Sequence, residues 1–225
     1  MLSADSKKSY VVVEIGNEWL KIAESRHAPR GRCITKVKYA RLAEIKGPLE
    51  EAISKIFKEM KLEKHSIITF IPRHLTNVRI LELPSTNPKE INDMVSLQVG
   101  KQTPYSKEEI TSAHDIIDTG KEGYIKIMLV IARRNIVSER IETLEKSGLA
   151  VEKVALSSEG VLDWFSIGYS SSIKQYYSQA FAIMDIDSNY SDFMVIRKGK
   201  MVFSRNIFIG ANNLTEDKIQ WQDKL

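Results

Sequence analysis

The chain has 225 residues, of which 43% are hydrophobic and 28% charged, and its formal net charge is +4. This composition is ordinary for a soluble globular protein, and the basic excess is too small to indicate a nucleic-acid partner. The single cysteine, Cys33, excludes an internal disulfide, and the four scattered histidines argue against a metal cluster. Without a signal peptide or an apolar run near the about 20 residues that span a bilayer, we expect a cytoplasmic protein that meets a membrane only through a partner.

The first segment is predicted to begin with three strands, over residues 10–15, 19–26 and 33–42. The continuous apolar and β-branched run at its start predicts a central strand that is buried on both faces. Gly47-Pro48 then opens a helix whose apolar residues recur at helical spacing, and a strand over 66–71 follows.

The middle segment predicts a strand over 77–83 and a helix over 88–102 that is capped near Asn87. A hairpin, a second helix ending at Gly148 and a last strand over 151–156 follow. This β-α-β-β-α-β order is the split βαβ pattern, so we expect a compact inserted subdomain over residues 76–155.

The third segment predicts a helix over about 158–167, a serine-rich linker, and strands over 181–186, 190–197 and 201–207. Its strand–turn–strand opening repeats that of the first segment, with an acid near the end of each first strand, Glu14 and Asp185. The repeat suggests two related half-folds whose turns meet at a shared cleft, which either holds a nucleotide or is a relic. We expect the second half to be incomplete, although a short native half is an alternative.

Four stretches together resemble the type IV pilus assembly protein PilM family of the actin-like ATPase superfamily: VVVEIGNEWLKIAES, LELPSTNPKEINDMVSLQVGKQTPYSKEEITSAHDII, IVSERIETLEKSGLAVEKVALSSEGVLDWF and AFAIMDIDSNYSDFMVIRKGKMVFSRNIFIG. Relatives by fold are the cell-division protein FtsA and the cytoplasmic domain of the secretion protein GspL. The resemblance implies an α/β, actin-like (ribonuclease H-like) half-domain over 1–75 that is completed by 156–176. It further implies an inserted βαββαβ subdomain over 76–155 and the start of a second half-domain over 177–225.

The resemblance also implies a role as a cytoplasmic scaffold of a type IV pilus or type II secretion platform, held peripherally at the inner membrane through a partner. Members of the family bind the cytoplasmic tail of a bitopic PilN-like membrane protein and help to couple it to the pilus motor ATPases. The tail is expected to dock in a groove between the first half-domain and the inserted subdomain.

A nucleotide site is the further implication of the resemblance, because actin-like hairpin turns present backbone N–H groups to phosphates and a nearby carboxylate holds hydrated Mg²⁺. The implied residues for ATP and Mg²⁺, with Asp185 as the metal ligand, are Glu14, Gly16, Asn17, Lys21, Asp185, Asp187 and Ser188. Glu14 stands where the superfamily usually has Asp, which changes the reach of the carboxylate. Asp187 stands where it usually has Gly, and an extra negative charge and a side chain there oppose the approach of a phosphate. The alternatives are therefore a weak ATPase and a site that holds no nucleotide.

Two other functions stay open at this point. A small-molecule kinase on this fold needs a catalytic aspartate, for which Asp115, Asp118 and Asp163 are the mid-chain candidates. A filament-forming protein similar to FtsA is the third reading. The basic residues Arg26, Arg30, Arg32, Lys36 and Lys38 indicate either a solvated hairpin or a surface for an anionic partner.

Overall fold

The computed structural model describes residues 9–28, 31–62, 66–119, 123–169 and 179–214. They form two compact units, one made of Met1–Ile71 with Val137–Leu156 and the other of Pro72–Ile136 with Ser157–Leu225. Of the linker predicted over residues 168–172, the first two residues belong to α4 and the others lie outside the described residues, as does the predicted helix start at Thr215. Within the described residues, no helix has the length and apolar character that crossing a membrane requires.

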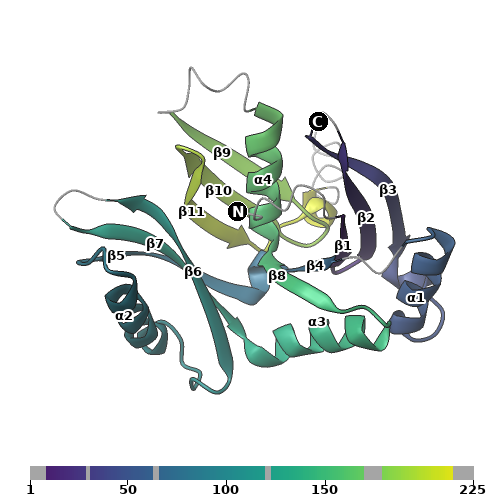
Figure 1. Cartoon of the computed structure of the whole chain (residues 1–225), viewed down its shortest axis with the longest axis horizontal. Coiled ribbons are helices and arrows are strands. Elements are labelled where there is room, and N and C mark those ends of the chain that lie inside the picture. Colours follow the sequence, from purple (N-terminus) through teal and green to yellow (C-terminus); the bar gives the residue numbers. More distant parts are fainter. Residues whose placement is uncertain (1–8, 29–30, 63–65, 120–122, 170–178, 215–225) are drawn as a thin grey trace, which may run out of the picture. The chain divides into compact units, whose positions relative to one another are not determined.

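The first unit is built on a five-stranded sheet with the order β3-β2-β1-β4-β8 (Figure 1). β1, β2 and β3 are antiparallel, whereas β4 runs parallel to β1 and β8 parallel to β4. The strands are β1 (Tyr10–Ile15), β2 (Trp19–Ala28), β3 (Gly31–Arg41), β4 (Ser66–Ile71) and β8 (Val151–Leu156), and the helices are η1 (Leu42–Glu44), α1 (Leu49–Glu59) and α3 (Arg134–Lys146).

One face of this sheet carries the core of the unit. The buried residues Val11 and Val13 of β1 pack with Ile53 and Phe57 of α1 and with Leu144 of α3. Because strand side chains alternate between faces, Val12 and Glu14 point to the other side, where they are only partly buried. The expectation that this strand is buried on both faces is therefore wrong, and only one face is covered fully.

The strand over residues 151–156 is placed differently from the sequence-based prediction. The predicted position is the last strand of the inserted subdomain, but β8 pairs in parallel with β4, with Thr69 opposite Val154. The physical reason lies in α3, which buries Leu144 completely in the core of the first unit. The helix therefore carries the chain back to this sheet, and the inserted part keeps only β5, α2, β6 and β7.

The second unit contains two three-stranded sheets, with the orders β5-β7-β6 and β11-β10-β9. All of their neighbouring strands are antiparallel. The elements are η2 (Arg73–Leu75), β5 (Thr76–Leu83), α2 (Pro88–Lys101), β6 (Ile110–Thr119), β7 (Ile125–Arg133), α4 (Ser157–Tyr169), β9 (Ala180–Ile186), β10 (Ser191–Arg197) and β11 (Lys200–Ile207).

Helix α2 begins as its sequence predicts. The Asn87 side chain accepts a hydrogen bond from the Lys89 amide at 3.0 Å, and Pro88 occupies the first turn, where a missing N–H costs nothing. Its residues Ile91, Val95 and Val99 then pack against the apolar side of the β5-β7-β6 sheet. In Figure 1, α2 lies along this sheet.

The β1–β2 hairpin of the first unit and the β9–β10 hairpin of the second unit share backbone details down to single residues. Ile15 pairs with Leu20 across one turn, and Ile186 pairs with Ser191 across the other, so that each loop has four residues. Each hairpin also pairs with a third strand that contains one extra residue, Thr35 in β3 and Val202 in β11. These bulges follow Glu24 and Val195, each four residues beyond the first pair of its hairpin. The repeat predicted from the sequence is therefore present in the backbone.

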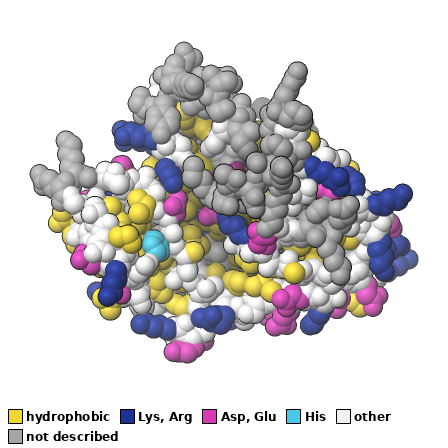
Figure 2. Space-filling view, in the orientation of Figure 1, with side chains coloured by type: hydrophobic (Ala, Val, Ile, Leu, Met, Phe, Trp, Pro, Cys, Tyr) yellow, Lys and Arg dark blue, Asp and Glu magenta, His cyan; other side chains and the backbone are white. Residues whose placement is uncertain are grey.

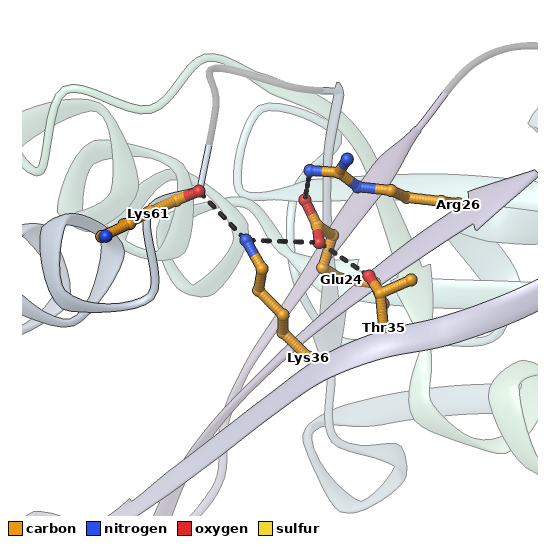
Figure 3. Close-up of polar contacts among 5 residues, drawn as sticks. All are labelled: Glu24, Arg26, Thr35, Lys36 and Lys61. Atoms are coloured by element: carbon orange, nitrogen blue, oxygen red, sulfur yellow. Dashed lines mark hydrogen bonds and ion pairs between the residues drawn. The ribbon is translucent and has the colours of Figure 1, made fainter.

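A buried carboxylate fixes the bulge of the first unit (Figure 3). Glu24 is fully buried and accepts hydrogen bonds from Arg26 Nη2 at 2.8 Å and from Thr35 Oγ1 at 2.6 Å. Lys36 Nζ lies 3.7 Å from the same carboxylate and donates to the Lys61 carbonyl at 3.1 Å. Two of the basic residues noted in the sequence thus serve the fold, whereas Arg30 and the side chain of Arg32 lie outside the described residues.

Candidate functional site

The first hairpin turn places four of the residues predicted to bind a nucleotide. The Gly16 amide donates to the Trp19 carbonyl at 2.8 Å, and a Cβ at position 16 would lie 3.3 Å from that oxygen. This close approach explains why a glycine fits the start of the turn. Asn17 follows it and is exposed. Because the Gly16 N–H already has an acceptor within the turn, it is not available to a phosphate in this conformation.

Lys21 and Glu14 are brought together by strand pairing. They are opposite each other in the register of β1 and β2, and Lys21 Nζ lies 3.0 Å from Glu14 Oε1. The ion pair cancels most of the positive charge that Lys21 would offer to a phosphate. Both side chains are substantially exposed, so the pair contributes little to stability and can be exchanged for another partner.

Arg140 is a residue at this turn that the sequence reasoning missed. It extends from α3, and its Nη1 donates to the carbonyl of Ile15, the last residue of β1, at 2.7 Å. The available signal was its spacing, because Arg140 lies three residues after Val137 and four before Leu144, on the side of α3 that faces the core. The guanidinium fixes the end of the strand from which the turn departs.

The second hairpin turn is closed in the same way as the first. The Asp187 amide donates to the Tyr190 carbonyl at 2.9 Å, and the Ser188 amide donates to the Asp187 carboxylate at 2.7 Å. The side chain of Asp187 therefore occupies an amide that a phosphate would need. It also brings a negative charge to the turn, as the substitution for glycine led us to expect.

The chain after β11 is packed closely against this turn. A Cβ at Gly210 would lie 2.5 Å from backbone atoms of Asp187, Ser188 and Asn189, which no side chain can tolerate. The amides of Ala211 and Asn212 donate to the carbonyls of Asp187 and Ser188 at 2.8 and 3.0 Å. Residues 210–212 thus hold the second turn in place through the main chain.

A row of polar side chains crosses the β11-β10-β9 sheet beside the turn. Asp185, Asp192 and Asn206 are opposite one another in the strand register, and Asn206 Nδ2 donates to Asp192 Oδ1 at 2.7 Å. Asp192 is almost completely buried. Burial raises the pKa of the Asp192 carboxyl above its usual value, and the hydrogen bond from Asn206 and the charge of Arg73 oppose this shift only in part.

Arg73 and His74, from the turn between β4 and β5, complete this polar cluster. Arg73 is buried and donates through Nε to Ser204 Oγ at 2.8 Å and through Nη1 to the Thr76 carbonyl at 2.9 Å. The His74 ring lies 4.0 Å from the Tyr190 ring, and its buried Nδ1 has no hydrogen-bond partner among the described residues. Burial lowers the pKa of His74, and the nearby charge of Asp187 partly counteracts this effect.

The predicted metal role of Asp185 stays a prediction. Asp185 is exposed at the end of β9, and among the described residues no three His, Cys, Asp or Glu side chains converge well enough to hold a metal ion. Mg²⁺ can be held by a single carboxylate with waters, so this finding does not decide the role of Asp185.

The three aspartates considered for a kinase are distributed over the second unit. Asp115 pairs with Lys200 at 2.9 Å, Asp118 lines a cavity of about 460 Å³ beside Lys126 and Arg197, and Asp163 is exposed on α4. Figure 2 shows both acidic and basic side chains on the part of the visible face that is described, with several basic ones at the right-hand edge. Neither observation singles out one of these carboxylates as a base.

Two sheets that each begin with a hairpin of this kind, β1–β2 and β9–β10, define a protein of the actin-like ATPase fold. A Bacteroides thetaiotaomicron protein with this fold and unknown function is 10% identical, with 99% of this chain and 77% of that chain covered and a TM-score of 0.52. The sequence matches the family of the type IV pilus assembly protein PilM over residues 35–223, which is most of its length. The chain therefore belongs to the PilM family.

Two solved structures of pilus and secretion proteins have the same fold. A structure of a PilM–PilN type IV pilus biogenesis complex is 17% identical, with 92% of this chain covered and a TM-score of 0.78. The chain spans 63% of that protein's length. The cytoplasmic domain of EpsL, an inner-membrane component of the Vibrio cholerae type II secretion system, is 11% identical, with 89% of this chain and 71% of that domain covered and a TM-score of 0.57. A comparison with curated proteins finds no match.

Proposed function

We propose that this protein is a cytoplasmic scaffold of a type IV pilus inner-membrane platform and binds the cytoplasmic tail of a PilN-like bitopic membrane protein. The observation that carries the proposal is the match of 92% of the chain, at a TM-score of 0.78, to a PilM solved together with PilN. The family match over residues 35–223 supports the same role. The protein is then held at the inner membrane by its partner and helps to couple that partner to the pilus motor ATPases.

The local chemistry supports binding over catalysis. In both hairpin turns the leading amide donates within the turn, and Lys21 is paired with Glu14. A catalyst of phosphoryl transfer needs donors and charges directed at the phosphates, together with a group that positions the attacking nucleophile. In this conformation the leading amide of each turn and the Lys21 ammonium group are engaged within the protein.

The experiment is a calorimetric titration of the protein with a synthetic peptide that reproduces the cytoplasmic tail of a PilN-like protein from the same organism. We expect saturable binding in the micromolar range, and a scrambled peptide of the same composition is the control. Equal heats from the tail and the scrambled peptide would overturn the proposal.

We propose weak binding of ATP with Mg²⁺ as a second property, on the strength of the matched geometry of the two hairpin turns. The residues that would contact the nucleotide are Glu14, Gly16, Asn17, Lys21, Asp185, Asp187 and Ser188, with Asp185 on the metal side. A titration with a non-hydrolysable ATP analogue and Mg²⁺ tests this property, and the absence of a saturable signal at millimolar analogue would exclude it.

A further inference from the structure

The β5-β7-β6 sheet has one strand that its helix leaves largely uncovered. Ile110, at the start of β6, is 4% exposed and packs with α2. Every second residue of a strand lies on the same face, so Ser112, His114 and Ile116 continue the face of Ile110. Ser112 is exposed, and Ile116 is 41% exposed. The cover that α2 provides therefore ends within the first residues of β6.

β6 is an edge strand of this sheet. The order β5-β7-β6 places β7 between β5 and β6, as in a split βαβ unit, and in that pattern a fourth strand would pair with β5. The pairing of β8 with β4 therefore leaves the position beside β5 unfilled and does not affect β6. Within the described part of the chain, β6 has a single neighbour, β7, and presents main-chain N–H and C=O groups along its other side.

A groove lies between α2 and this open strand. Its cavity measures about 490 Å³, and both elements line it. The floor is apolar and consists of Val95, Val99 and Ile110, while Lys107, His114 and Arg134 lie at its rim. None of the described residues that line the groove is acidic. An apolar floor with a cationic rim fits a ligand that combines an apolar side chain with a carboxylate.

Arg134 holds the end of the groove in a fixed position. Its Nε donates to the Glu108 carbonyl at 2.8 Å, and its Nη2 donates to the Ile110 carbonyl at 2.7 Å. The guanidinium is thereby anchored next to the first residue of β6. A charge that is fixed before binding costs little ordering entropy when an anionic group arrives.

We propose that this groove binds an extended, acidic segment of a partner protein, which pairs with β6 as the fourth strand of the sheet. Main-chain hydrogen bonds to an exposed strand supply affinity, and pockets for alternate side chains supply specificity. One apolar side chain of the segment rests on Val95 and Val99, and an acidic side chain meets Lys107 or Arg134. A strand fits better than a helix, because the apolar floor is short and Ser112 and His114 interrupt it. The site does not depend on the identity of the tail partner.

The test uses a fluorescent synthetic peptide, acetyl-Glu-Val-Glu-Leu-Glu-Val-amide, with the intact protein. We expect saturable anisotropy, together with slower hydrogen exchange of β6 amides in the complex. The same peptide with alternate N-methyl groups cannot pair as a strand and should lose binding. A version with Lys in place of Glu should bind about tenfold more weakly, which corresponds to about 1.4 kcal/mol. Binding that survives N-methylation, protection of β5 in place of β6, or no saturation would overturn the proposal.

A pair of variants on one helix locates the site. Ser96 is exposed and lines the groove, whereas Asp93 is exposed on the same helix and does not line it. Ser96→Trp should fill the groove and abolish peptide binding, and Asp93→Trp should leave it unchanged. Equal binding by the two variants would contradict the proposal. If Ser96→Trp fails to fold, the exposed residue Lys107 provides the alternative, because Lys107→Glu should weaken binding of the acidic peptide and strengthen that of the Lys version.

The result is separable from that of the tail titration. A tail peptide that binds while the acidic probe does not would overturn the groove and leave the proposed scaffold role intact. An acidic probe that binds β6, together with a tail peptide that does not bind, would support the groove and overturn the proposed scaffold role.

Discussion

Lys21 and Glu14 form an ion pair of 3.0 Å across the first hairpin, where the strand register sets them directly opposite each other. Lys21 was predicted to attract a phosphate of the nucleotide, and Glu14 was predicted to stand near the metal ion. Because each neutralises the other and Glu18 adds a carboxylate within the turn, the turn has no net positive charge with which to attract a nucleotide.

The Glu14–Lys21 ion pair allows a direct test of nucleotide binding at the first turn. If Glu14 serves only to neutralise Lys21, Glu14→Gln frees the ammonium group and should tighten binding of an ATP analogue with Mg²⁺ by about 1.4- to fivefold, in keeping with about 0.2–1 kcal/mol for an exposed pair. Calorimetric titration of the two proteins measures the change. Weaker binding by the variant would instead mean that Glu14 supports the metal, and Lys21→Ala provides the matched control, which should weaken binding in both cases.

Gly210 should be the least replaceable residue of the second turn. Gly210→Ala brings a Cβ to 2.5 Å from three backbone atoms, so the turn must shift, at a cost of about 1–3 kcal/mol or more. The control is Gly100→Ala in α2, where the new Cβ meets nothing within 4 Å and helix propensity favours alanine by about 1 kcal/mol. Denaturant unfolding should show opposite signs for the two variants, and a neutral Gly210→Ala would show that residues 210–212 do not hold the turn.

Glu24 should strengthen the fold at neutral pH and lose this effect in acid. The hydrogen bond from Arg26 is the main cause that lowers the pKa of Glu24 from 4.5 to about 2, although burial acts in the opposite direction. Because the folded value is below the unfolded one, the stabilisation is present above pH 4.5 and disappears between about pH 4.5 and pH 2. Glu24→Gln should cost about 1–3 kcal/mol at pH 7 and should flatten the acid limb of a stability–pH curve. Parallel curves for the two proteins would contradict this role.

Asp192 should have the opposite effect on the pH dependence of stability, because it favours the folded chain in acid. Burial raises the pKa of its carboxyl above 3.8, so the proton is held more tightly in the folded chain than in the unfolded one. Its contribution to stability is therefore complete below pH 3.8 and is lost as the pH rises through the folded pKa. Asp192→Asn should remove this decline, so that the variant loses less stability than the parent protein between pH 4 and pH 7. Thermal melts across that range measure the difference, and Asp163→Asn, at an exposed position, is the control.

The strands and turns of the two hairpins could be predicted from the sequence, because β-branched runs and Gly16-Asn17 or Asp187-Ser188-Asn189 determine structure locally. The sheet to which β8 belongs could not be predicted. Apolar spacing marks a strand, but its partner depends on where α3 packs, and that is decided by tertiary contacts of residues such as Leu144. The sequence pattern contains no information about that choice.

The candidate site was predicted in part. The turn residues were named correctly as turn residues, but Arg73, His74 and Asp192 were missed. Asp192 and Glu24 each carried a usable signal, since both are in phase with buried residues of their strands, Met194 and Ile22. An acid at such a position predicts a buried carboxylate with partners. Its partners, however, come from distant segments that the sequence does not bring together.

The extra residues in β3 and β11 are the positions of these strands at which a deletion should disturb the pairing least. Removing Thr35 or Val202 would close the bulge and keep the cross-strand pairs on both sides of it, such as Ser25 with Ile34 and Glu24 with Lys36. Removing a neighbour such as Lys38 would instead shift part of the strand by one position and turn its side chains to the opposite side of the sheet. Thr35 also bonds to Glu24, so its loss should cost more than that of Val202, while a deletion outside the bulges should abolish cooperative melting.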